Sequence, residues 1–277
     1  MALEPGLYVA ATPIGNLKDV TFRVIEALKE ADRIYCEDTR QTAKLCAAYA
    51  VRTPRAAYNE HNAERVQPDI IEALRGGARI CLVSDAGTPL ISDPGFRLVE
   101  AARAAGICVF PLPGPNAAIA ALSAAGLYSE RFYFAGFAPA KAEARLTLFR
   151  SLARIDATLV FYESPARLAA SLGAMREVFG DRRAVVAREI TKIHETFDDG
   201  TLSALAEIYK SGAKGEIVVL VEPAAAEERA GDAEIDRFIA NALETLSVKD
   251  AAAAAADAFD IPKRAAYERA LALKASF

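Results

Sequence analysis

Short apolar segments alternate with longer amphipathic segments along the N-terminal part of the chain. The short segments have the composition of buried strands, and the longer ones repeat apolar residues at helical spacing. The expected strands lie at 6–11, 34–36, 78–83 and 108–112, and the expected helices at 21–29, 39–48 and 95–105. Strands that alternate with helices in this way favour an α/β layer built on a largely parallel sheet.

A cluster of Pro and Gly residues at 111–115 interrupts this alternation, which then resumes. In the second series the expected helices lie at 116–125, 142–153, 165–178 and 202–210, and the expected strands at 132–134, 158–162, 184–187, 196–197 and 216–221. We therefore expect two α/β domains, an N-terminal one at 1–115 and a C-terminal one at 116–223.

The C-terminal part of the chain follows a linker-like stretch at 223–231 and has only helical patterns. The expected helices lie at 232–245, 248–259 and 263–274. Ser247 with Asp250 three residues later is a capping-box pattern, and residues 260–262 are expected to form a turn. The last helix carries four basic residues against one acidic residue. We expect a helical tail at 232–277 that resembles a helix-turn-helix unit.

The composition narrows the class of protein. Hydrophobic residues make up 53% and charged residues 25% of the 277 positions, close to a globular average, which excludes disorder for the bulk of the chain. No apolar run reaches the roughly 18–20 residues that a helix needs to cross a bilayer, so no membrane protein is expected. The first residues show neither a basic segment nor a long apolar run, so we expect no secretory signal.

The cysteines and histidines argue against a metal site. Cys36, Cys46, Cys81 and Cys108 are far apart and form no CxxC pair, and the chain has only two His. We expect four free core thiols, as in the reducing cytoplasm. The net charge of −4 is not that of a protein that coats nucleic acid, but it leaves a local basic patch possible.

Three strand-to-helix loops carry the candidate chemistry, at 11–21, 82–95 and 111–118. The first contains neither the GxGxxG dinucleotide fingerprint nor the GxxxxGK[ST] phosphate loop. Ligands of open α/β sheets bind at the carboxyl ends of the strands, so the three loops are expected to converge on one crevice. They offer backbone N–H groups and small residues, which is typical of a cradle for a cofactor that performs its own chemistry.

The loop at 82–95 is the most specialised of the three, because it contains two Gly, two Pro, two Asp and three hydroxyl residues. Gly allows close approach of the backbone to a ligand, so we expect the first half of the loop to bind one. The second half has a structural interpretation, in which Ser92 or Asp93 caps a helix that begins at Pro94.

In this order, the loops resemble those of the tetrapyrrole methylase superfamily of S-adenosylmethionine-dependent methyltransferases. More narrowly, the chain resembles the bacterial family of 16S rRNA cytidine 2′-O-ribose methyltransferases. The segments that carry the resemblance are 11–17 (ATPIGNL), 36–40 (CEDTR), 84–95 (SDAGTPLISDPG), 113–115 (PGP), 136–141 (GFAPAK), 161–165 (FYESP) and 188–192 (REITK). Ala138, Ala140 and Ala166 depart from the residues common in that family.

The resemblance implies an S-adenosylmethionine cleft between the two domains. By matched position, the cofactor-binding residues would be Pro13, Ile14, Asp85, Ala86, Gly87, Thr88, Ile91, Ser92, Asn116, Ala117, Phe161, Tyr162, Ala187 and Ile217. Without the resemblance, the loops alone would indicate a polar ligand in an α/β crevice.

A ribose hydroxyl is a weak nucleophile, so a general base is expected within about 2.6–3.2 Å of it. The candidates are Asp38, His61, Glu163 and Glu189, and the sequence does not choose among them. Asp38 also has the position of a helix cap before Thr39, and His61 lies in a polar segment that a solvated loop would explain equally well. The motifs require no metal.

Basic residues are candidate contacts to RNA phosphates, for which Lys and Arg are the expected side chains. The candidates are Arg40, Lys141, Arg145, Arg188, Lys192, Lys263 and Arg264. Lys141 and Arg145 recur with Arg150 and Arg154 along one expected helix, where a solvated face is the alternative interpretation. For the helical tail, the alternative is a hairpin that packs on the body or on a second copy of the chain.

The resemblance implies a cytoplasmic enzyme that methylates a cytidine ribose of 16S rRNA in the small ribosomal subunit and forms a homodimer. Two alternatives stay open. The same scaffold could methylate a tetrapyrrole or a protein side chain, or the chain could be an RNA-binding module without activity.

Overall fold

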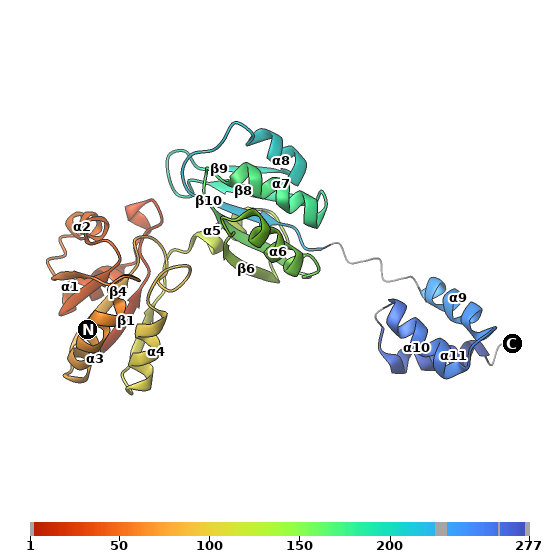
Figure 1. Cartoon of the computed structure of the whole chain (residues 1–277). Coiled ribbons are helices and arrows are strands. Elements are labelled where there is room, and N and C mark those ends of the chain that lie inside the picture. Colours follow the sequence, from red (N-terminus) through yellow and green to blue (C-terminus); the bar gives the residue numbers. More distant parts are fainter. Residues whose placement is uncertain (1–2, 225–231, 260, 275–277) are drawn as a thin grey trace. The chain divides into compact units, whose positions relative to one another are not determined.

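The computed structural model describes residues 3–224, 232–259 and 261–274 (Figure 1). Its internal contacts divide the chain into two compact units, 1–223 and 224–277. The first unit holds two five-stranded sheets with helices, and the second holds helices α9 to α11. The predicted fold class, two α/β sheets followed by a helical C-terminal region, is confirmed.

The first sheet is entirely parallel, with strand order β3-β2-β4-β1-β5. Its strands are β1 (Gly6–Ala10), β2 (Arg33–Cys36), β3 (Arg55–Ala57), β4 (Arg79–Val83) and β5 (Val109–Leu112). Parallel neighbours need crossover connections, and the helices that follow each strand supply them. The carboxyl ends of all five strands therefore lie at one edge of the sheet.

Helices cover both faces of the first sheet. The helical segments are η1 (Leu17–Asp19), α1 (Phe22–Glu30), α2 (Thr39–Ala48), α3 (Ala63–Arg75) and α4 (Phe96–Ala104). Successive side chains of a strand point to opposite faces, so Tyr8 packs with residues of α1 and α2 while Leu7 packs with residues of α3 and α4. Each face thus has its own core.

The region between α2 and β4 differs from the sequence-based expectation. The edge strand β3 was not predicted, because its three residues are too few to show a period of two. Asn59 to Asn62 form a turn whose amide side chains bond nearby backbone groups, and α3 follows with Pro68 inside it. This edge of the sheet is therefore built by turn chemistry rather than by hydrophobic periodicity.

The second sheet is mixed, with strand order β6-β7-β10-β8-β9. Only β6 and β7 are parallel, and the other pairs are antiparallel. Its strands are β6 (Phe132–Phe137), β7 (Thr158–Glu163), β8 (Arg183–Arg188), β9 (Thr196–Thr201) and β10 (Ile217–Val221). The expected strand at 196–197 is real but extends over six residues.

The faces of the second sheet are covered unequally. Its helices are α5 (Ala117–Ala124), α6 (Ala142–Leu152), α7 (Leu168–Phe179) and α8 (Leu202–Ile208). One core joins the sheet to α6, α7 and α8 and includes Phe149 and Phe161. The opposite core joins it to α5 alone and includes Val160 and Val218. The face with the single helix is the one that borders the candidate site.

The C-terminal unit contains α9 (Asp232–Leu243), α10 (Val248–Phe259) and α11 (Lys263–Lys274), as the periodicity predicts. Ala residues of α10 and α11 pack with Ile235 and Ile239 of α9. One of the two bonds of the predicted capping box is present, because the Asp250 N–H donates to Ser247 Oγ at 3.2 Å; the Asp250 carboxylate accepts from the Ser247 hydroxyl at 2.6 Å. The predicted linker at 225–231, Asp260 of the predicted turn, and residues 275–277 lie outside the described residues.

The cysteines are all free, but only three belong to a core. Cys36, Cys46 and Cys81 are buried as expected, whereas Cys108 is exposed just before β5, so its prediction as a core thiol is wrong. Within the described ranges, no helix has the length and apolarity to cross a membrane. No group of three or more His, Cys, Asp or Glu side chains in those ranges could hold a metal ion.

Candidate functional site

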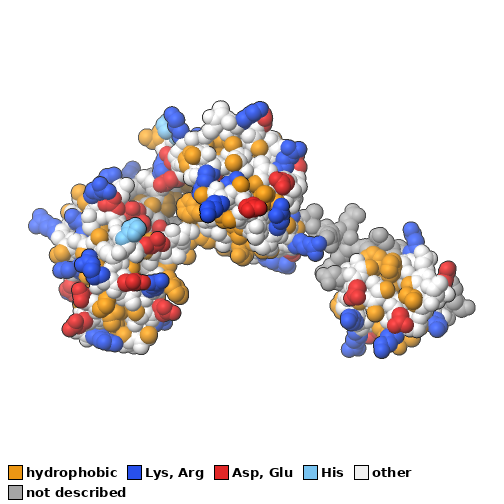
Figure 2. Space-filling view, viewed as in Figure 1, with side chains coloured by type: hydrophobic (Ala, Val, Ile, Leu, Met, Phe, Trp, Pro, Cys, Tyr) orange, Lys and Arg blue, Asp and Glu red, His pale blue; other side chains and the backbone are white. Residues whose placement is uncertain are grey.

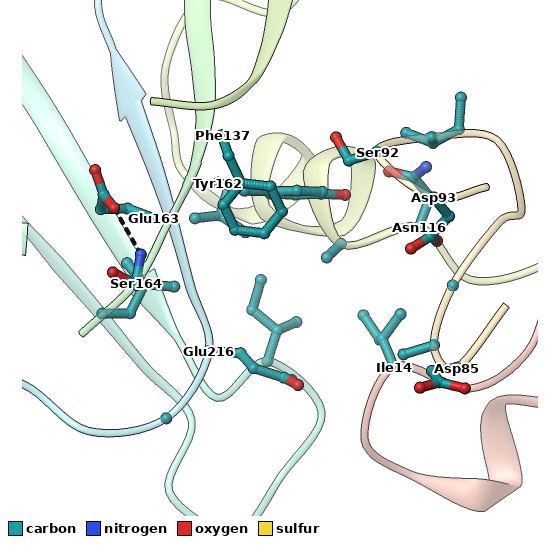
Figure 3. Close-up of a pocket in the computed structure, with 18 of the residues that line it drawn as sticks. Ile14, Asp85, Ser92, Asp93, Asn116, Phe137, Tyr162, Glu163, Ser164 and Glu216 are labelled. Carbon is teal, nitrogen blue, oxygen red and sulfur yellow. Dashed lines mark hydrogen bonds between the residues drawn. The ribbon is translucent and has the colours of Figure 1, made fainter. Parts of the chain in front are cut away.

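A pocket of about 350 Å³ lies between the two sheets of the first unit (Figure 3). Its volume falls in the range of roughly 300–1,000 Å³ that is usual for small-molecule sites. Eleven of the predicted cofactor-binding residues line it, namely Ile14, Asp85, Ala86, Gly87, Thr88, Ile91, Ser92, Asn116, Ala117, Tyr162 and Ile217. In Figure 3, Ile14, Asp85, Ser92, Asp93 and Asn116 lie across the pocket from Phe137, Tyr162 and Glu163.

Backbone hydrogen bonds hold the three predicted loops together at the pocket. The Thr12 N–H donates to Gly87 O at 2.8 Å, and the Gly87 N–H donates back to Thr12 O at 3.0 Å. The Thr88 hydroxyl donates to Pro115 O at 3.0 Å, which joins the second loop to the third. Gly87 has a φ of +81° and a Cβ there would lie 3.4 Å from Ile14 Cγ2, so a side chain would strain this junction.

The N-terminus of α5 is the third component of this wall. The Asn116 side chain accepts a hydrogen bond from Ile119 N–H, so it caps the helix, and Ala117 is the first helical residue beside the pocket. An Asn cap leaves other N–H groups of the first turn free for a ligand. The predicted convergence of the three loops on one crevice is therefore what the structure shows.

The second half of the loop at 82–95 does not cap a helix. Helix α4 begins at Phe96 and its N-cap is Gly95, with no side-chain cap, so the expected capping by Ser92 or Asp93 is wrong. Leu90 and Ser92 instead have positive φ values of 73° and 63°, which non-glycine residues rarely adopt. The resulting turn places Ser92 and Asp93 at the pocket.

Asp93 is the carboxyl group with the most perturbed pKa in this pocket. Burial raises its pKa to about 6, and the nearby charges of Glu37 and Asp85 act in the same direction. The pKa of Glu37 is raised as well, by burial and by Asp85 and Glu60. A pocket that crowds carboxylates in this way favours a cationic ligand.

The second sheet provides an apolar and aromatic wall. Tyr162 packs edge-on against Phe134 and Phe137, with ring centroids 4.9 and 5.4 Å apart. Ile190 and Val218 add aliphatic surface. Flat rings and aliphatic groups on this side would suit an aromatic heterocycle, opposite the carboxylates of the first wall.

Three predicted cofactor residues do not line the pocket. Phe161 is fully buried on the opposite face of the sheet, where its ring packs against Phe149, because adjacent strand residues face opposite ways. Ala187 is also fully buried, in the core beneath α5. Pro13 borders a second, neighbouring cavity instead.

Two of the four candidate bases do not line the pocket, although the Asp38 N–H donates to Asp85 Oδ1 at 2.8 Å. Asp38 caps α2 and accepts hydrogen bonds from the Arg40 guanidinium and the Arg40 N–H, which lower its pKa to about 2. A carboxylate with so low a pKa is a poor proton acceptor. His61 is exposed in the turn before α3 and lines neither cavity.

The other two candidates are engaged in structural bonds. Glu163 lines the pocket, but its side chain is only 1% exposed, and its carboxylate accepts from the Ser164 N–H, Arg167 Nε and the Ser171 hydroxyl. Glu189 accepts from Lys192 Nζ and from the Glu216 N–H, and both bonds lower its pKa. None of the four offers a free carboxylate or imidazole to the pocket.

The segment after β8 connects the two halves of the unit. Thr191 Oγ1 accepts from the Asn16 N–H at 3.1 Å, and a Cβ on Gly15 would lie 2.6 Å from Lys192 Cγ. Partial burial lowers the pKa of Lys192, but the hydrogen bonds to Glu189 and Glu216 outweigh it and the net pKa is raised. Lys192 therefore bridges carboxylates beside the pocket rather than standing free for a phosphate.

The remaining candidate RNA contacts fall into different environments. Arg145 is only 8% exposed on the inner side of α6, so its prediction as a phosphate contact is wrong, whereas Lys141 is exposed. Arg40 is exposed but paired with Asp38, and Arg188 is half-buried. In the C-terminal unit, Lys263 and Arg264 are exposed, and Arg264 pairs with Glu268.

No face visible in Figure 2 gathers charges of a single sign. Basic and acidic side chains are interspersed over both units in that view. On the face that Figure 2 shows, a contact to RNA would therefore rest on individually placed cations rather than on one broad basic patch.

Several pocket residues were not anticipated from the sequence. They are Asp93, Phe137, Ser164, Pro165, Ile190, Gly215 and Val218. Asp93 could have been found from the excess of Asp and Gly in its loop. The others lie on or beside strands of a mixed sheet, where no rule marks one strand end as the ligand edge.

Comparison with known families matches nearly the whole chain. Residues 6–206 match the family described as Tetrapyrrole (Corrin/Porphyrin) Methylases, and residues 229–274 match the family described as RsmI C-terminal HTH domain. The first match covers the first sheet and the second sheet as far as α8, ending before β10, and the second covers helices α9 to α11.

Curated relatives match over almost their full length. A protein of Mesorhizobium japonicum named ribosomal RNA small subunit methyltransferase I is 50% identical over 276 residues, covering 98% of this chain and 93% of the relative. The protein of the same name from Pseudomonas aeruginosa is 46% identical and covers 96% of each chain.

Solved structures show the same fold. The methyltransferase CobJ aligns with a TM-score of 0.60 and 27% identity, covering 79% of this chain and 95% of that one. Diphthine synthase aligns with a TM-score of 0.61 at 17% identity, covering 78% of this chain and 89% of that one. The latter likeness concerns the fold alone.

Proposed function

The chain belongs to the tetrapyrrole methylase family, and on that premise we propose that it transfers a methyl group to the 2′-hydroxyl of a cytidine ribose in small-subunit rRNA. Its cofactor is S-adenosylmethionine. The observation that carries the acceptor is the 50% identity, over 98% of the chain, to a protein named ribosomal RNA small subunit methyltransferase I.

The pocket has the chemistry that S-adenosylmethionine requires. Asp85, Asp93 and Glu216 surround it with carboxylates that favour the positive charge of a sulfonium. Tyr162 and Phe137 offer aromatic surface to an adenine, and Gly87 lines the pocket with a backbone φ of +81° that favours glycine. When bound, the cofactor supplies an electrophilic methyl group, and the protein's task is to orient it and exclude water.

The residues of this chain then have three tasks. The loops held together by Thr12, Gly87 and Thr88 fix the pocket, so that cofactor and acceptor can be aligned without further movement. The pocket carboxylates Asp85, Asp93 and Glu216 are the groups to which the hydroxyl proton can pass. Asp85 accepts one hydrogen bond from the Asp38 N–H at 2.8 Å, and Glu216 accepts one from Lys192 Nζ at 2.7 Å. We propose this set in place of Asp38 and His61, which do not line the pocket, and of Glu163 and Glu189, whose carboxylates each accept two or more hydrogen bonds.

Methyl transfer to ribosomal particles tests the proposal. Small subunits from a bacterial strain that lacks its own copy of this enzyme should take up tritiated methyl groups from labelled cofactor, and protein-free 16S rRNA should be compared in parallel. Label in a tetrapyrrole or in protein would instead favour the alternative acceptors. Tight RNA binding without transfer would indicate a non-catalytic binding module.

We propose that the enzyme works as a homodimer. Strand β6 is an edge strand, and its residues Phe132 and Tyr133 and the preceding Tyr128 are between 42% and 44% exposed. Clustered apolar side chains at an unpaired edge are typical of an association surface. Light scattering should give twice the chain mass of 29.6 kDa, and Phe132→Asp should shift it toward the single-chain mass. A wild-type mass of one chain at micromolar concentration would exclude the dimer.

We propose that the C-terminal unit contacts RNA. Lys263 and Arg264 begin α11 and are exposed, in the position of the second helix of a helix-turn-helix. Removing 232–277 should leave cofactor binding intact, weaken binding to small subunits and flatten its salt dependence. Equal methylation by the truncated and full chains across a salt titration would assign the unit a purely structural role.

The proposed substrate also indicates the cellular compartment in which the enzyme acts. Small ribosomal subunits of bacteria are found in the cytoplasm, so we propose that the enzyme acts there. The buried thiols of Cys36, Cys46 and Cys81 agree with a reducing environment. Fractionation of cells should recover the enzyme with the ribosomal particles at low salt and free of them at high salt.

A further inference from the structure

A second cavity, of about 200 Å³, lies beside the cofactor pocket. The loop after β1, the first turns of α2 and Lys192 enclose it. It shares Ile14, Asp85, Ala86 and Glu216 with the cofactor pocket, so these residues form a common wall where the two cavities meet.

A position next to the cofactor pocket is where a methyl acceptor has to bind. The reacting atoms of a group transfer must come within about 3–3.5 Å of one another. The second cavity is smaller than the roughly 300–1,000 Å³ of sites that enclose a whole small molecule. It therefore suits one part of a larger ligand, such as a single nucleoside of a chain that remains outside.

The lining of the second cavity matches a nucleotide. Pro13, Leu17 and Leu45 give it apolar surface for a base or a sugar face, and Gln41 gives an amide for hydrogen bonds. Enzymes that act on a nucleotide within a structured nucleic acid turn it out of the stack into such a pocket.

Lys44 is the cation of this cavity that is available to a phosphate. Its Nζ donates to Gln41 Oε1 at 2.7 Å, and no carboxylate of the described residues lies within 4.0 Å of it. Lys192, on the opposite side, is held by Glu189 and Glu216 at 2.8 and 2.7 Å. An exposed lysine that lines this cavity is well placed to hold a nucleotide by its phosphate.

We propose, on the basis of the proposed function, that this cavity receives the acceptor nucleotide, with its base on Leu17 and Leu45 and its phosphate at Lys44. The ribose then faces the common wall. Its 2′-oxygen forms the new C–O bond as the C–S bond breaks, the bonding electron pair stays on sulfur, and the hydroxyl proton passes to Asp85 or Glu216.

Two substitutions test this placement with the full-length enzyme and small ribosomal subunits as the probe. Lys44→Ala removes the cation, and we expect the KM for subunits to rise about tenfold, with recovery in Lys44→Arg. Leu17→Trp fills the cavity from a residue that does not line the cofactor pocket, and we expect kcat/KM to fall by about tenfold or more.

The affinity for S-adenosylhomocysteine, measured by calorimetry, should stay within about twofold of wild type in these variants. The matched controls are Lys29→Ala on α1 and Ile208→Trp on α8, which replace a lysine by alanine and an aliphatic residue by tryptophan at exposed positions that line neither cavity. Both controls should methylate subunits at the wild-type rate.

Three results would overturn the proposal. If Leu17→Trp weakens S-adenosylhomocysteine binding as much as it lowers turnover, the cavity belongs to the cofactor. If both cavity variants methylate subunits like wild type, the acceptor binds elsewhere. If the wild-type enzyme transfers no methyl group to RNA, the proposed function itself fails and this placement fails with it.

Discussion

The wall from the first sheet and the wall from the second sheet place their residues by different means. In the first, parallel strands bring three loops to one edge, where Thr12 and Gly87 join two of them by backbone hydrogen bonds and the Thr88 hydroxyl joins the third at Pro115 O. In the second, the mixed sheet contributes side chains such as Tyr162 and Val218 from one face of its strands. The first wall therefore carries backbone donors together with Asp85 and Asp93, and the second carries aromatic and aliphatic surface together with Glu163 and Glu216.

This difference predicts a division of labour. Substitutions in the first wall should change cofactor affinity with little change in stability, since its carboxylates crowd a solvent-connected pocket. Substitutions in the second wall should change stability first, because its residues extend directly from buried strands.

The largest effect is expected from Asp85→Ala in the first wall. Loss of a charge-assisted contact lowers affinity by about 10–150-fold, corresponding to roughly 1.5–3 kcal/mol. Calorimetry with S-adenosylmethionine measures it, and Asp69→Ala, an exposed carboxylate of α3 that lines neither cavity, is the matched control. Unchanged affinity in Asp85→Ala would remove this residue from the site.

In the second wall, Glu163→Ala should change the stability of the protein first. The buried carboxylate satisfies the Ser164 N–H, Arg167 and Ser171, so its removal should lower the free energy of unfolding by about 1–3 kcal/mol. Thermal denaturation should show a midpoint lower by several degrees. Glu177→Ala on α7, which is exposed, should leave the midpoint in place.

The pH dependence of cofactor binding tests the role of Asp93 in the first wall. Burial raises the pKa of Asp93 to about 6, so this carboxyl group is charged above that pH and neutral below it. A cation binds better to the charged form, so affinity should fall as pH falls through 6, by about tenfold between pH 7.5 and 5. In Asp93→Asn the dependence should flatten; an unaltered profile would show that another group titrates.

The smallest effects are expected from substitutions at the start of α6, where Lys141 is the N-cap residue and Arg145 lies in the first turns. Lys141→Ala should reduce the slope of subunit binding against the logarithm of salt concentration by about 0.7–0.9, the value for one phosphate contact. Arg145→Ala should leave that slope unchanged and lower the denaturation midpoint, because Arg145 is buried. The opposite assignment of the two effects would contradict the observed burial.

How much of each region can be predicted from the sequence depends on whether local or tertiary contacts build it. The parallel sheet could be predicted because strand ends, Gly-rich loops and helix starts follow one another in sequence, as residues 82–96 do. The second wall could not, because β8, β9 and β10 pair by tertiary contacts that local patterns do not encode. The resemblance supplied Tyr162 and Ile217, but it also suggested Phe161, which the alternation of the strand turns to the opposite core.

The sequence-based interpretation of single side chains was wrong where tertiary packing determines whether they are buried or exposed. Arg145 shares helical spacing with exposed Lys141, and only packing shows that it faces inward. Asp93 had the position of a helix cap, but positive φ values at Leu90 and Ser92 turn the loop before α4 begins. Both differences arise from tertiary structure, which sequence spacing does not contain.

The most direct test of the account is the identity of the methylated nucleoside. Small subunits from a strain without this enzyme are incubated with it and with S-adenosylmethionine, the rRNA is digested to nucleosides, and these are separated by mass spectrometry. The account predicts a single new product, cytidine with the methyl group on its ribose 2′-oxygen. A methyl group found on a base, or on no nucleoside at all, would contradict it.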